Sequence, residues 1–380
     1  MIRTSLALPL LLVASVSFSQ TTRKKMTFGA PTAASVAAAD RAIEASLNSD
    51  CSEVDLNKGI NSPFNKIPVY DQDGSSLCYS FATSQMVDYY RMKKGDKSYD
   101  LTNPVYAAWA TYFQKAGTGQ TNLRGGFSTD VNKTLKHSGV CSNEEVKSRL
   151  SEFTKSAGVT EAEVLHFLEV VYDNYGQGGG KNWNKVEKTL TYDSNISCDQ
   201  QANLKRVLVK KGYLGVPSTA ILQNLFKGCK AQPVKVPNLK EFYLGSDLDM
   251  KKAVDGALTG DMPAEINMCS VVFNTPKARG QKNINPTLGR DTEGNSNPNC
   301  GRHAVLVTGR KMIGGQCAYM IRNSWGAYWK PKGAMTCSCR TLKGEYKQAC
   351  NKPDEVDEYV GCWFDSKDLM ANVGSVDVYQ

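Results

Sequence analysis

One cysteine, Cys78, lies where the chain could place a nucleophile. It follows a turn rich in glycine and serine in the stretch DQDGSSLCYSFA, residues 71–82, and an apolar run comes next. A thiol attacks a carbonyl as the thiolate, and an ordinary cysteine with a pKa near about 8.5 is mostly protonated at neutral pH. A helix N-terminus and a nearby imidazolium both stabilise the thiolate. Cys78 is therefore a candidate nucleophile; by itself the residue would be read as half of a disulfide.

Three histidines could supply the base for such a nucleophile. His137 lies in a polar helical segment and His166 lies within EVLHFLEVV, so both are expected to be structural. His303 opens the apparent strand HAVLVTG, at a loop-to-strand junction where a side chain can face a cleft. Asn323 in IRNSWG ends a later strand, and its amide could orient the imidazole. The set predicts acyl transfer by a nucleophile, a base and an orienting amide.

The elements that must position these residues differ between two parts of the chain. SFATSQMVDYYRMKKG, residues 80–95, has apolar residues at helical spacing and ends at Gly95, which places Cys78 at a helix N-terminus. Helical patterns continue to about residue 230, and after residue 246 short β-rich runs such as SVVF and AYMIRNS predominate. We expect an α+β fold with a cleft between a helical half and a β-rich half.

Separated segments of the chain resemble, in the same order, the papain and cathepsin family of cysteine peptidases. Gln72 lies six residues before Cys78, and the aromatic Tyr79 follows it. His303 in RHAVLV and Asn323 in NSWG match the family's base and the asparagine that holds it. The resemblance implies that Gln72 donates to the oxyanion. It also implies a papain-like two-part fold and hydrolysis of peptide bonds through a thioester acyl-enzyme, without a cofactor or a metal.

The same resemblance implies the residues that bind substrate. RGGFSTDVNKTLKHSGV resembles the glycine pair and the following helix that edge the family's substrate cleft. The backbone of Gly125 and Gly126 would pair with an extended peptide, and Phe127 would line one wall. Trp325 would screen the contact between the histidine and the asparagine.

The chain departs from the family pattern in two places. Ser75 and Leu123 occupy positions where the family usually has two cysteines joined by a disulfide. His303 follows Cys78 by about 225 residues, whereas about 130 to 150 is typical. Roughly 80 to 90 residues are therefore inserted, and the basic, helical stretch at 146–245 is the candidate.

These observations divide the chain into five expected parts, with the β-rich part antiparallel and barrel-like. They are a signal peptide at 1–19, a short N-terminal arm or pro-segment at 20–54, a helical half at 55–145, a helical insertion at 146–245 and a β-rich half at 246–380. The size of the insertion raises the hypothesis that it covers the cleft.

The first residues, MIRTSLALPLLLVASVSFS, are typical of a signal peptide. Arg3 precedes an apolar run from Leu6 to Val16, and the small residues Ser17 and Ser19 suit a signal peptidase. We expect cleavage after Ser19 and secretion to an extracellular or periplasmic space. No other apolar run approaches the length that spans a membrane.

Cysteine usage agrees with export. The chain has 12 cysteines, and an oxidising compartment favours their pairing in disulfides. If Cys78 is free, an odd number remains, so at least one other cysteine is free, intermolecular or removed. Cys51 precedes the first fold-like segment and is the one expected to be lost on processing.

Two other patterns have chemical alternatives. CSC at 337–339, with Cys350 and Cys362, could form a zinc site, but disulfides are favoured in an exported chain. NKT at 132 and NIS at 195 have the form of glycosylation acceptors.

The net charge of +9 is concentrated in one region. Residues 181–240 carry eleven Lys/Arg and three Asp/Glu, which could attach the protein to acidic surfaces or simply form a solvated face. Aromatic residues do not alternate with the basic ones as in a base-stacking surface, so nucleic acid is not a predicted partner. The predicted partners are protein or peptide substrates of a monomeric enzyme.

Two alternatives to a peptidase stay open at this stage. One is a papain-like binding protein that is catalytically idle or cleaves only itself. The other is an amidase or transpeptidase that acts on cell-wall peptides, which the basic insertion would suit.

Overall fold

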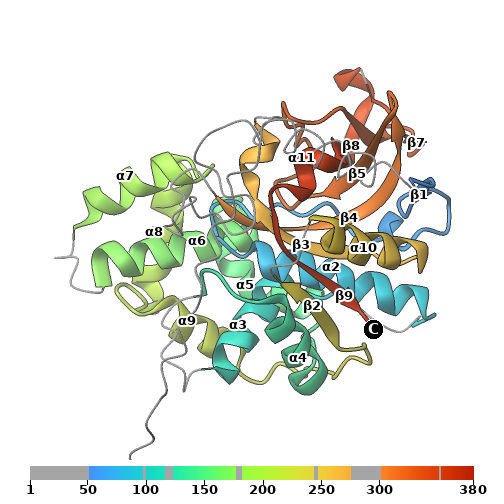
Figure 1. Ribbon diagram of the computed structural model, residues 1–380. Coiled ribbons are helices and arrows are strands. Elements are labelled where there is room, and N and C mark those ends of the chain that lie inside the picture. Colours follow the sequence, from blue (N-terminus) through green and yellow to red (C-terminus); the bar gives the residue numbers. More distant parts are fainter. Residues whose placement is uncertain are drawn as a thin grey trace, which may run out of the picture. The chain divides into compact units, whose positions relative to one another are not determined.

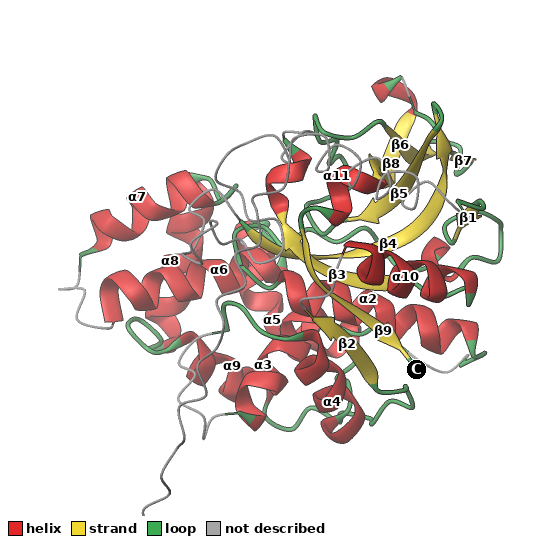
Figure 2. Ribbon diagram, viewed as in Figure 1, coloured by secondary structure: helices red, strands yellow, loops and turns green. Residues whose placement is uncertain are grey.

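The computed structural model describes residues 51–96, 100–115, 123–176, 182–243, 247–274, 301–350 and 352–380. The expected signal peptide and most of the expected N-terminal arm lie outside these residues. Helices dominate the first part of the described chain, and one antiparallel sheet dominates the rest (Figures 1 and 2). This arrangement confirms the predicted α+β fold class.

The helices follow in chain order. They are α2 (Cys78–Lys93), α3 (Pro104–Gln114), α4 (Ser128–Ser138), α5 (Asn143–Ala157), α6 (Glu161–Val171), α7 (Trp183–Asp193), α8 (Cys198–Lys211), α9 (Ser218–Phe226), α10 (Asp247–Thr259) and α11 (Ser366–Met370). Short 3₁₀ turns lie at Pro63–Asn65, Ser270–Phe273 and Pro353–Glu355, and a π-helical turn lies at Tyr172–Gly176. In these described residues, no helix combines the length and the apolar character that a bilayer crossing requires.

Helix α2 is the central helix of the first part. Most of its side chains are buried, from Tyr79 to Arg91, because the helix packs against α3 and α4 on one side and strands β3 and β4 on the other. Arg91 and Lys93 in its last turn suit the negative end of the helix dipole. The burial fixes the direction in which Cys78, its first residue, faces.

The sheet joins strands from distant parts of the chain. Its strands are β1 (Val54–Asp55), β2 (Leu239–Tyr243), β3 (Ala264–Cys269), β4 (Arg302–Ile313), β5 (Gln316–Arg322), β6 (Thr336–Thr341), β7 (Tyr346–Lys347), β8 (Val356–Asp365) and β9 (Val373–Tyr379). Their order is β2-β9-β3-β4-β5-β8-β6-β7, with β1 also paired to β4.

The sheet is open, unlike the barrel-like half that the sequence predicted. Within the described residues, β2 pairs with β9 and β7 pairs with β6, and these two end strands do not pair with each other. Closure needs such a pairing at a consistent tilt and stagger. The short β7 hairpin and the edge strand β2 leave the two ends of the sheet separate.

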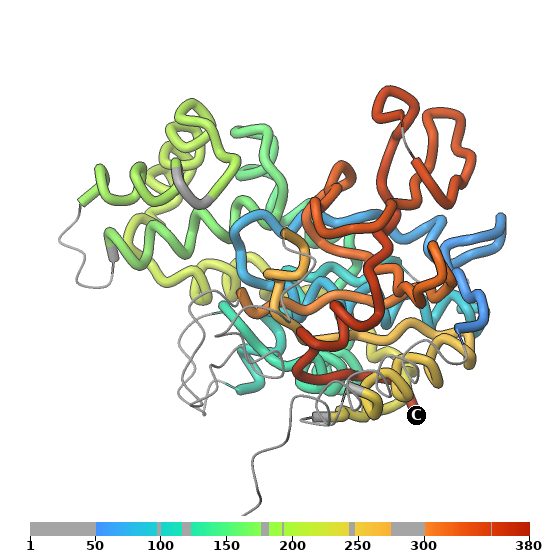
Figure 3. Tube along the Cα trace, turned by 45° about the horizontal axis from the view of Figure 1, so that its top comes forward, coloured from blue at the N-terminus to red at the C-terminus, as the bar shows by residue number. Residues whose placement is uncertain are grey.

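Helices α5 to α9 form a segment whose two ends meet. Cys141, just before α5, forms a disulfide with Cys229, just after α9, and Val140 forms an isolated bridge with Gln232. Figure 3 traces this segment, coloured from green to yellow, as one group of helices. Strand β2 lies inside the stretch 146–245 that the sequence assigned to an insertion, yet it belongs to the sheet.

The cysteines are largely paired, which overturns one expectation. Cys51 forms a disulfide with Cys317, so the expectation that Cys51 is lost on processing is wrong. The other pairs between described residues are Cys141–Cys229, Cys337–Cys362 and Cys339–Cys350, and Cys269 is also disulfide-bonded. The four cysteines considered for a zinc site, Cys337, Cys339, Cys350 and Cys362, are thus paired in disulfides. Cys78 and Cys198 are the free cysteines in the described part of the chain.

The two glycosylation triplets differ in exposure. The side chain of Asn132 is buried, and its Nδ2 donates to the carbonyl oxygen of Pro237 at 3.0 Å. Asn195 is exposed in the loop before α8. The fold leaves only the second triplet of this pair accessible.

A buried arginine connects the helical part to the sheet. Arg322, 1% exposed at the end of β5, donates from Nε to Gln85 Oε1 at 2.8 Å and from Nη2 to the Ile67 carbonyl at 2.6 Å. A third bond, at 3.4 Å, reaches the Val360 carbonyl. Burial lowers the pKa of Arg322 to about 10. The guanidinium thus ties α2 to the strand that precedes Asn323.

We expect Arg322→Met to lower the free energy of unfolding by about 3 kcal/mol, because buried acceptors lose their donor. Urea unfolding measures the change. The matched control is Arg206→Met on the exposed face of α8, which should change stability by less than about 0.5 kcal/mol. Equal losses in the two variants would remove Arg322 from the connection between the helices and the sheet.

Candidate active site

Cys78 lies against the strand that carries His303. Its side chain is partly exposed at the first residue of α2. Burial raises the pKa of the Cys78 thiol, while the backbone N–H groups of Ala304 and Tyr79 lower it. Ala304 follows His303 in β4, so the interaction places the sulfur beside the start of that strand.

His303 and Asn323 meet because β4 and β5 are paired antiparallel. Leu306 lies opposite Arg322 in that pairing, so the residue after β5 comes close to the first residues of β4. His303 Nε2 lies 2.6 Å from Asn323 Oδ1, and both side chains are buried. An amide oxygen only accepts, so Nε2 carries the hydrogen and Nδ1 keeps a free lone pair.

Burial shifts both titrating groups toward their neutral forms. It raises the pKa of Cys78, as above, and it lowers the pKa of His303 to about 4, against the opposing effect of the Asn323 bond. These directions differ from the thiolate–imidazolium pair expected from the sequence. They favour the neutral forms of both the Cys78 thiol and the His303 imidazole.

Aromatic rings cover the contact between His303 and Asn323. The Trp325 ring stacks on the imidazole, with centroids 4.6 Å apart and planes 27° apart. The buried Phe273 meets the imidazole edge-on at 6.0 Å. The sequence did not predict a role for Phe273, because nothing near this apolar residue in SVVF indicates that it packs against His303. Together the rings limit the access of water to the hydrogen bond.

Gln72 is oriented by Ser324. The Ser324 hydroxyl donates to Gln72 Oε1 at 2.6 Å, and the Gln72 backbone N–H donates to the Ser324 carbonyl at 2.8 Å. The Ser324 backbone N–H donates in turn to Asn323 Oδ1 at 2.8 Å. With Oε1 committed, the NH₂ end of the buried Gln72 amide is the end left to donate. Ser324 had no predicted role; its place in the NSWG segment was the only signal.

The predicted glycine pair lies beside the nucleophile segment. The Gly125 N–H donates to the Ser76 carbonyl at 3.2 Å, and its φ of +69° suits glycine. A Cβ added at Gly126 would lie 2.5 Å from Cε2 of Tyr79, so this position has no room for a side chain. Phe127 is 62% exposed. The backbone of both glycines is therefore at the surface next to Tyr79.

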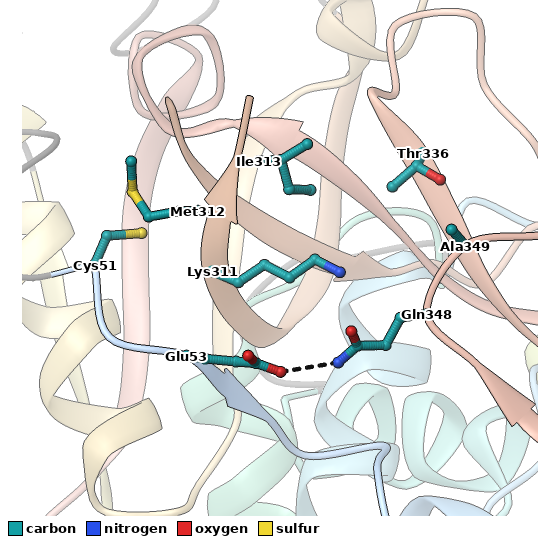
Figure 4. Close-up of a pocket in the computed structure, with 8 residues that line it drawn as sticks. All are labelled: Cys51, Glu53, Lys311, Met312, Ile313, Thr336, Gln348 and Ala349. Atoms are coloured by element: carbon teal, nitrogen blue, oxygen red, sulfur yellow. Dashed lines mark hydrogen bonds between the residues drawn. The ribbon is translucent and has the colours of Figure 1, made fainter. Parts of the chain in front are cut away.

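A separate pocket lies away from these residues. It has a volume of about 630 Å³, and Figure 4 shows Glu53 Oε1 accepting from Gln348 at 2.9 Å within its lining. The lining residues are Cys51, Glu53, Lys311, Met312, Ile313, Thr336, Gln348 and Ala349. None of the residues that the sequence predicted for catalysis or substrate binding lines it.

One group in the described residues has the composition of a metal site. Cys141, Glu145 and Cys229 have ligand atoms close together, but the two cysteines are joined in a disulfide. Disulfide sulfurs are not the thiolates that bind metals. This group is therefore structural.

No family model and no curated protein matches this chain, whereas solved structures do. Xylellain, a cysteine protease from Xylella fastidiosa, is 16% identical, with 88% of each chain covered and a TM-score of 0.40. A structure from work on the mite allergens Blo t 1 and Der p 1 is 14% identical, with 82% of this chain and 70% of that chain covered and a TM-score of 0.37.

Digestive procathepsin L 3 of Tenebrio molitor larval midgut is 15% identical, covering 84% of this chain and 71% of that chain, with a TM-score of 0.32. At these identities and TM-scores, the similarity by itself assigns no activity. The chain is thus an α+β protein whose segments around Cys78, His303 and Asn323 are similar to those of papain-like cysteine proteases, and the solved structures that it is similar to include such proteases.

Proposed function

We propose that this chain is a secreted papain-like cysteine peptidase that hydrolyses peptide bonds through a thioester acyl-enzyme. One observation carries the proposal. His303 Nε2 is held by Asn323 Oδ1 at 2.6 Å, which leaves Nδ1 as the base, on the strand whose Ala304 N–H lowers the pKa of the Cys78 thiol. The free thiol of Cys78 at the first residue of α2 supports the same reading, because its electrostatics involve the backbone N–H of Ala304, the residue after His303.

The reaction begins with proton transfer from the Cys78 thiol to His303 Nδ1 as the sulfur bonds to the peptide carbonyl carbon. The carbonyl oxygen becomes an oxyanion that accepts from the Cys78 backbone N–H and from Gln72 Nε2. His303 then protonates the leaving amine as the C–N bond breaks. It next takes a proton from water as that water attacks the thioester carbonyl. The C–S bond then breaks and His303 returns the proton to sulfur, which releases the acid and restores the free thiol. Asn323 keeps the ring in register throughout.

The proposal includes export and removal of residues 1–19. The described disulfides fit an oxidising compartment. Because Cys51 is bonded to Cys317, a cut before residue 51 would leave the folded part intact. In the same proposal residues 141–229 form the bulk of the insertion, since a disulfide closes its base. Attachment to acidic surfaces through residues 181–240 stays a prediction.

We expect Gln72→Ala to lower kcat by about 10²-fold with little change in KM, because the amide donates to the oxyanion only as charge develops. Steady-state kinetics with a chromogenic peptide measures both constants. Gln223→Ala is the matched control, since Gln223 is exposed on α9, and it should match the parent. An unchanged kcat for Gln72→Ala would remove this residue from the oxyanion site.

Labelling with a thiol-directed epoxide, with and without peptide substrate, tests the proposal against an idle binding protein. A working site should label Cys78 faster than the exposed Cys198, and substrate should protect Cys78 alone. Equal rates at the two cysteines would contradict the proposal. Parallel digestion of casein and of cell-wall peptides then separates a peptidase from a wall amidase or transpeptidase, which would act on the wall peptides alone.

A further inference from the structure

We propose that Glu169 on α6 is a positioning residue that holds residues 123–127, the glycine loop, in the conformation that binds an extended peptide. The inference rests on the proposed peptidase function. It gives the helical segment between Cys141 and Cys229 a part in substrate binding. This part acts through the glycine loop and needs no direct contact between the segment and the substrate.

Glu169 reaches the glycine loop through Arg124. Arg124 Nε donates to Glu169 Oε2 at 3.0 Å, and its Nη2 lies 3.3 Å from Asp173 Oδ2. The two carboxylates differ in environment, because the Glu169 side chain is 3% exposed and that of Asp173 is 45% exposed. Water screens the second pair far more than the first. Glu169 is therefore the partner that can fix the position of Arg124.

The burial of Glu169 is itself informative. Carboxylates are rarely buried without a partner, because desolvation is costly. Burial raises the pKa of Glu169 to about 7, while Arg124 and the Leu123 backbone N–H act in the opposite direction. Both opposing groups belong to the glycine loop. The loop thus supplies the groups that oppose the effect of burial on Glu169.

The nucleophile segment holds the other side of the same loop. The Tyr79 hydroxyl donates to the Leu123 carbonyl at 3.0 Å, and the Gly125 N–H donates to the Ser76 carbonyl. Residues 123–127 contain no cysteine, so these contacts are non-covalent. The loop therefore contacts both α6, through Glu169, and the segment around Cys78, through Tyr79 and Ser76.

Loosening this loop should affect peptide binding more than chemistry. Cys78, His303 and Asn323 are held by α2, β4 and the end of β5, which do not depend on Arg124. The backbone of Gly125 and Gly126 would instead pair with substrate residues that precede the scissile bond. An extended peptide needs that backbone in place, whereas a substrate with a single residue before the bond does not.

In the full chain, we expect Glu169→Gln to raise KM for an extended peptide about 10-fold and to leave kcat within about 2-fold. The reason is that the lost contacts bind the substrate equally in the ground state and in the transition state. A substrate with one residue before the scissile bond should keep its KM. Asp173→Asn, which removes the exposed partner of the same arginine, is the matched control and should change KM less than about 2-fold. Equal KM changes for both substrates would contradict positioning of the glycine loop.

A double-mutant cycle with Arg124→Met locates the effect in the pair. Arg124 is exposed, so this variant is expected to fold even if Glu169→Gln does not. The double variant should raise KM no more than either single variant, because each removes the same ion pair. Additive effects would mean that Glu169 and Arg124 act separately, and the inference would fail.

Hydrogen exchange separates this inference from the proposed function. Amides of residues 123–127 should exchange faster in Glu169→Gln than in the parent and in Asp173→Asn, with no substrate present. Faster exchange in a chain that cleaves no peptide would refute the peptidase and keep the anchoring of the loop. Unchanged exchange in an active peptidase would refute the anchoring alone.

Discussion

Replacing Cys78 by alanine should abolish peptide hydrolysis and leave the fold intact. The change removes the atom that bonds to the substrate carbonyl, and loss of a catalytic nucleophile lowers kcat by about 10⁴-fold or more in comparable enzymes. The side chain is partly exposed at the first position of α2 and forms no disulfide, so its removal opens no buried cavity. Circular dichroism and thermal unfolding should match the parent, and peptide cleavage should fall to background.

Cys198→Ala is the matched control for this prediction. Cys198 is the other free cysteine of the described residues, and it is exposed at the start of α8. Its replacement should leave kcat and KM unchanged. If Cys78→Ala cleaves denatured protein at the parental rate, the nucleophile is another group and the peptidase mechanism derived from Cys78 is wrong.

Replacing His303 by glutamine should lower kcat by about 10⁴-fold, because the thiol then has no base and the leaving amine no acid. Alkylation of Cys78 by iodoacetamide at neutral pH should slow in the same variant. The matched control is His137→Gln, since His137 is exposed near the end of α4, and it should behave as the parent. A similar loss in both variants would point to misfolding in place of catalysis.

The parent enzyme should remain active at pH 5 and lose kcat/KM as the pH falls through about 4. Burial lowers the pKa of His303 to about 4, so the ring is neutral above that pH and accepts the thiol proton. Below it the ring is protonated and cannot act as the base. The acid limb of the kcat/KM profile reports this group in the free enzyme. An acid limb near pH 6.5 would mean that burial does not set the pKa of the base.

Local signals predicted much of the candidate site. The turn before Cys78 and the helical spacing after it placed this residue at a helix N-terminus, where α2 indeed begins. The strand pattern placed His303 at the start of β4 and Asn323 just after β5. Such signals depend on residues within a few positions of one another, and so the chain order displays them.

Contacts between distant segments were not predictable in this way. Ser324 orients Gln72 across 252 residues, and Cys51 pairs with Cys317 across 266 residues. The sequence assigned Cys51 to a processed segment because nothing near it shows a partner. The sequence also predicted a barrel-like sheet, whereas the sheet is open. Closure depends on whether the two end strands pair, and the sequence pattern of a strand does not indicate its partner.

The sequence by itself determined which groups can do chemistry and on which kind of element each one lies, because residue types and periodicity are properties of short stretches. Only the tertiary structure decided which of these groups meet and in which protonation state. It buried His303 beneath Trp325, turned the Gln72 amide through Ser324, and brought Glu169 of the helical segment to Arg124 of the glycine loop. Such contacts and the pKa shifts that accompany them arise from packing, which forms only when remote surfaces exclude water together.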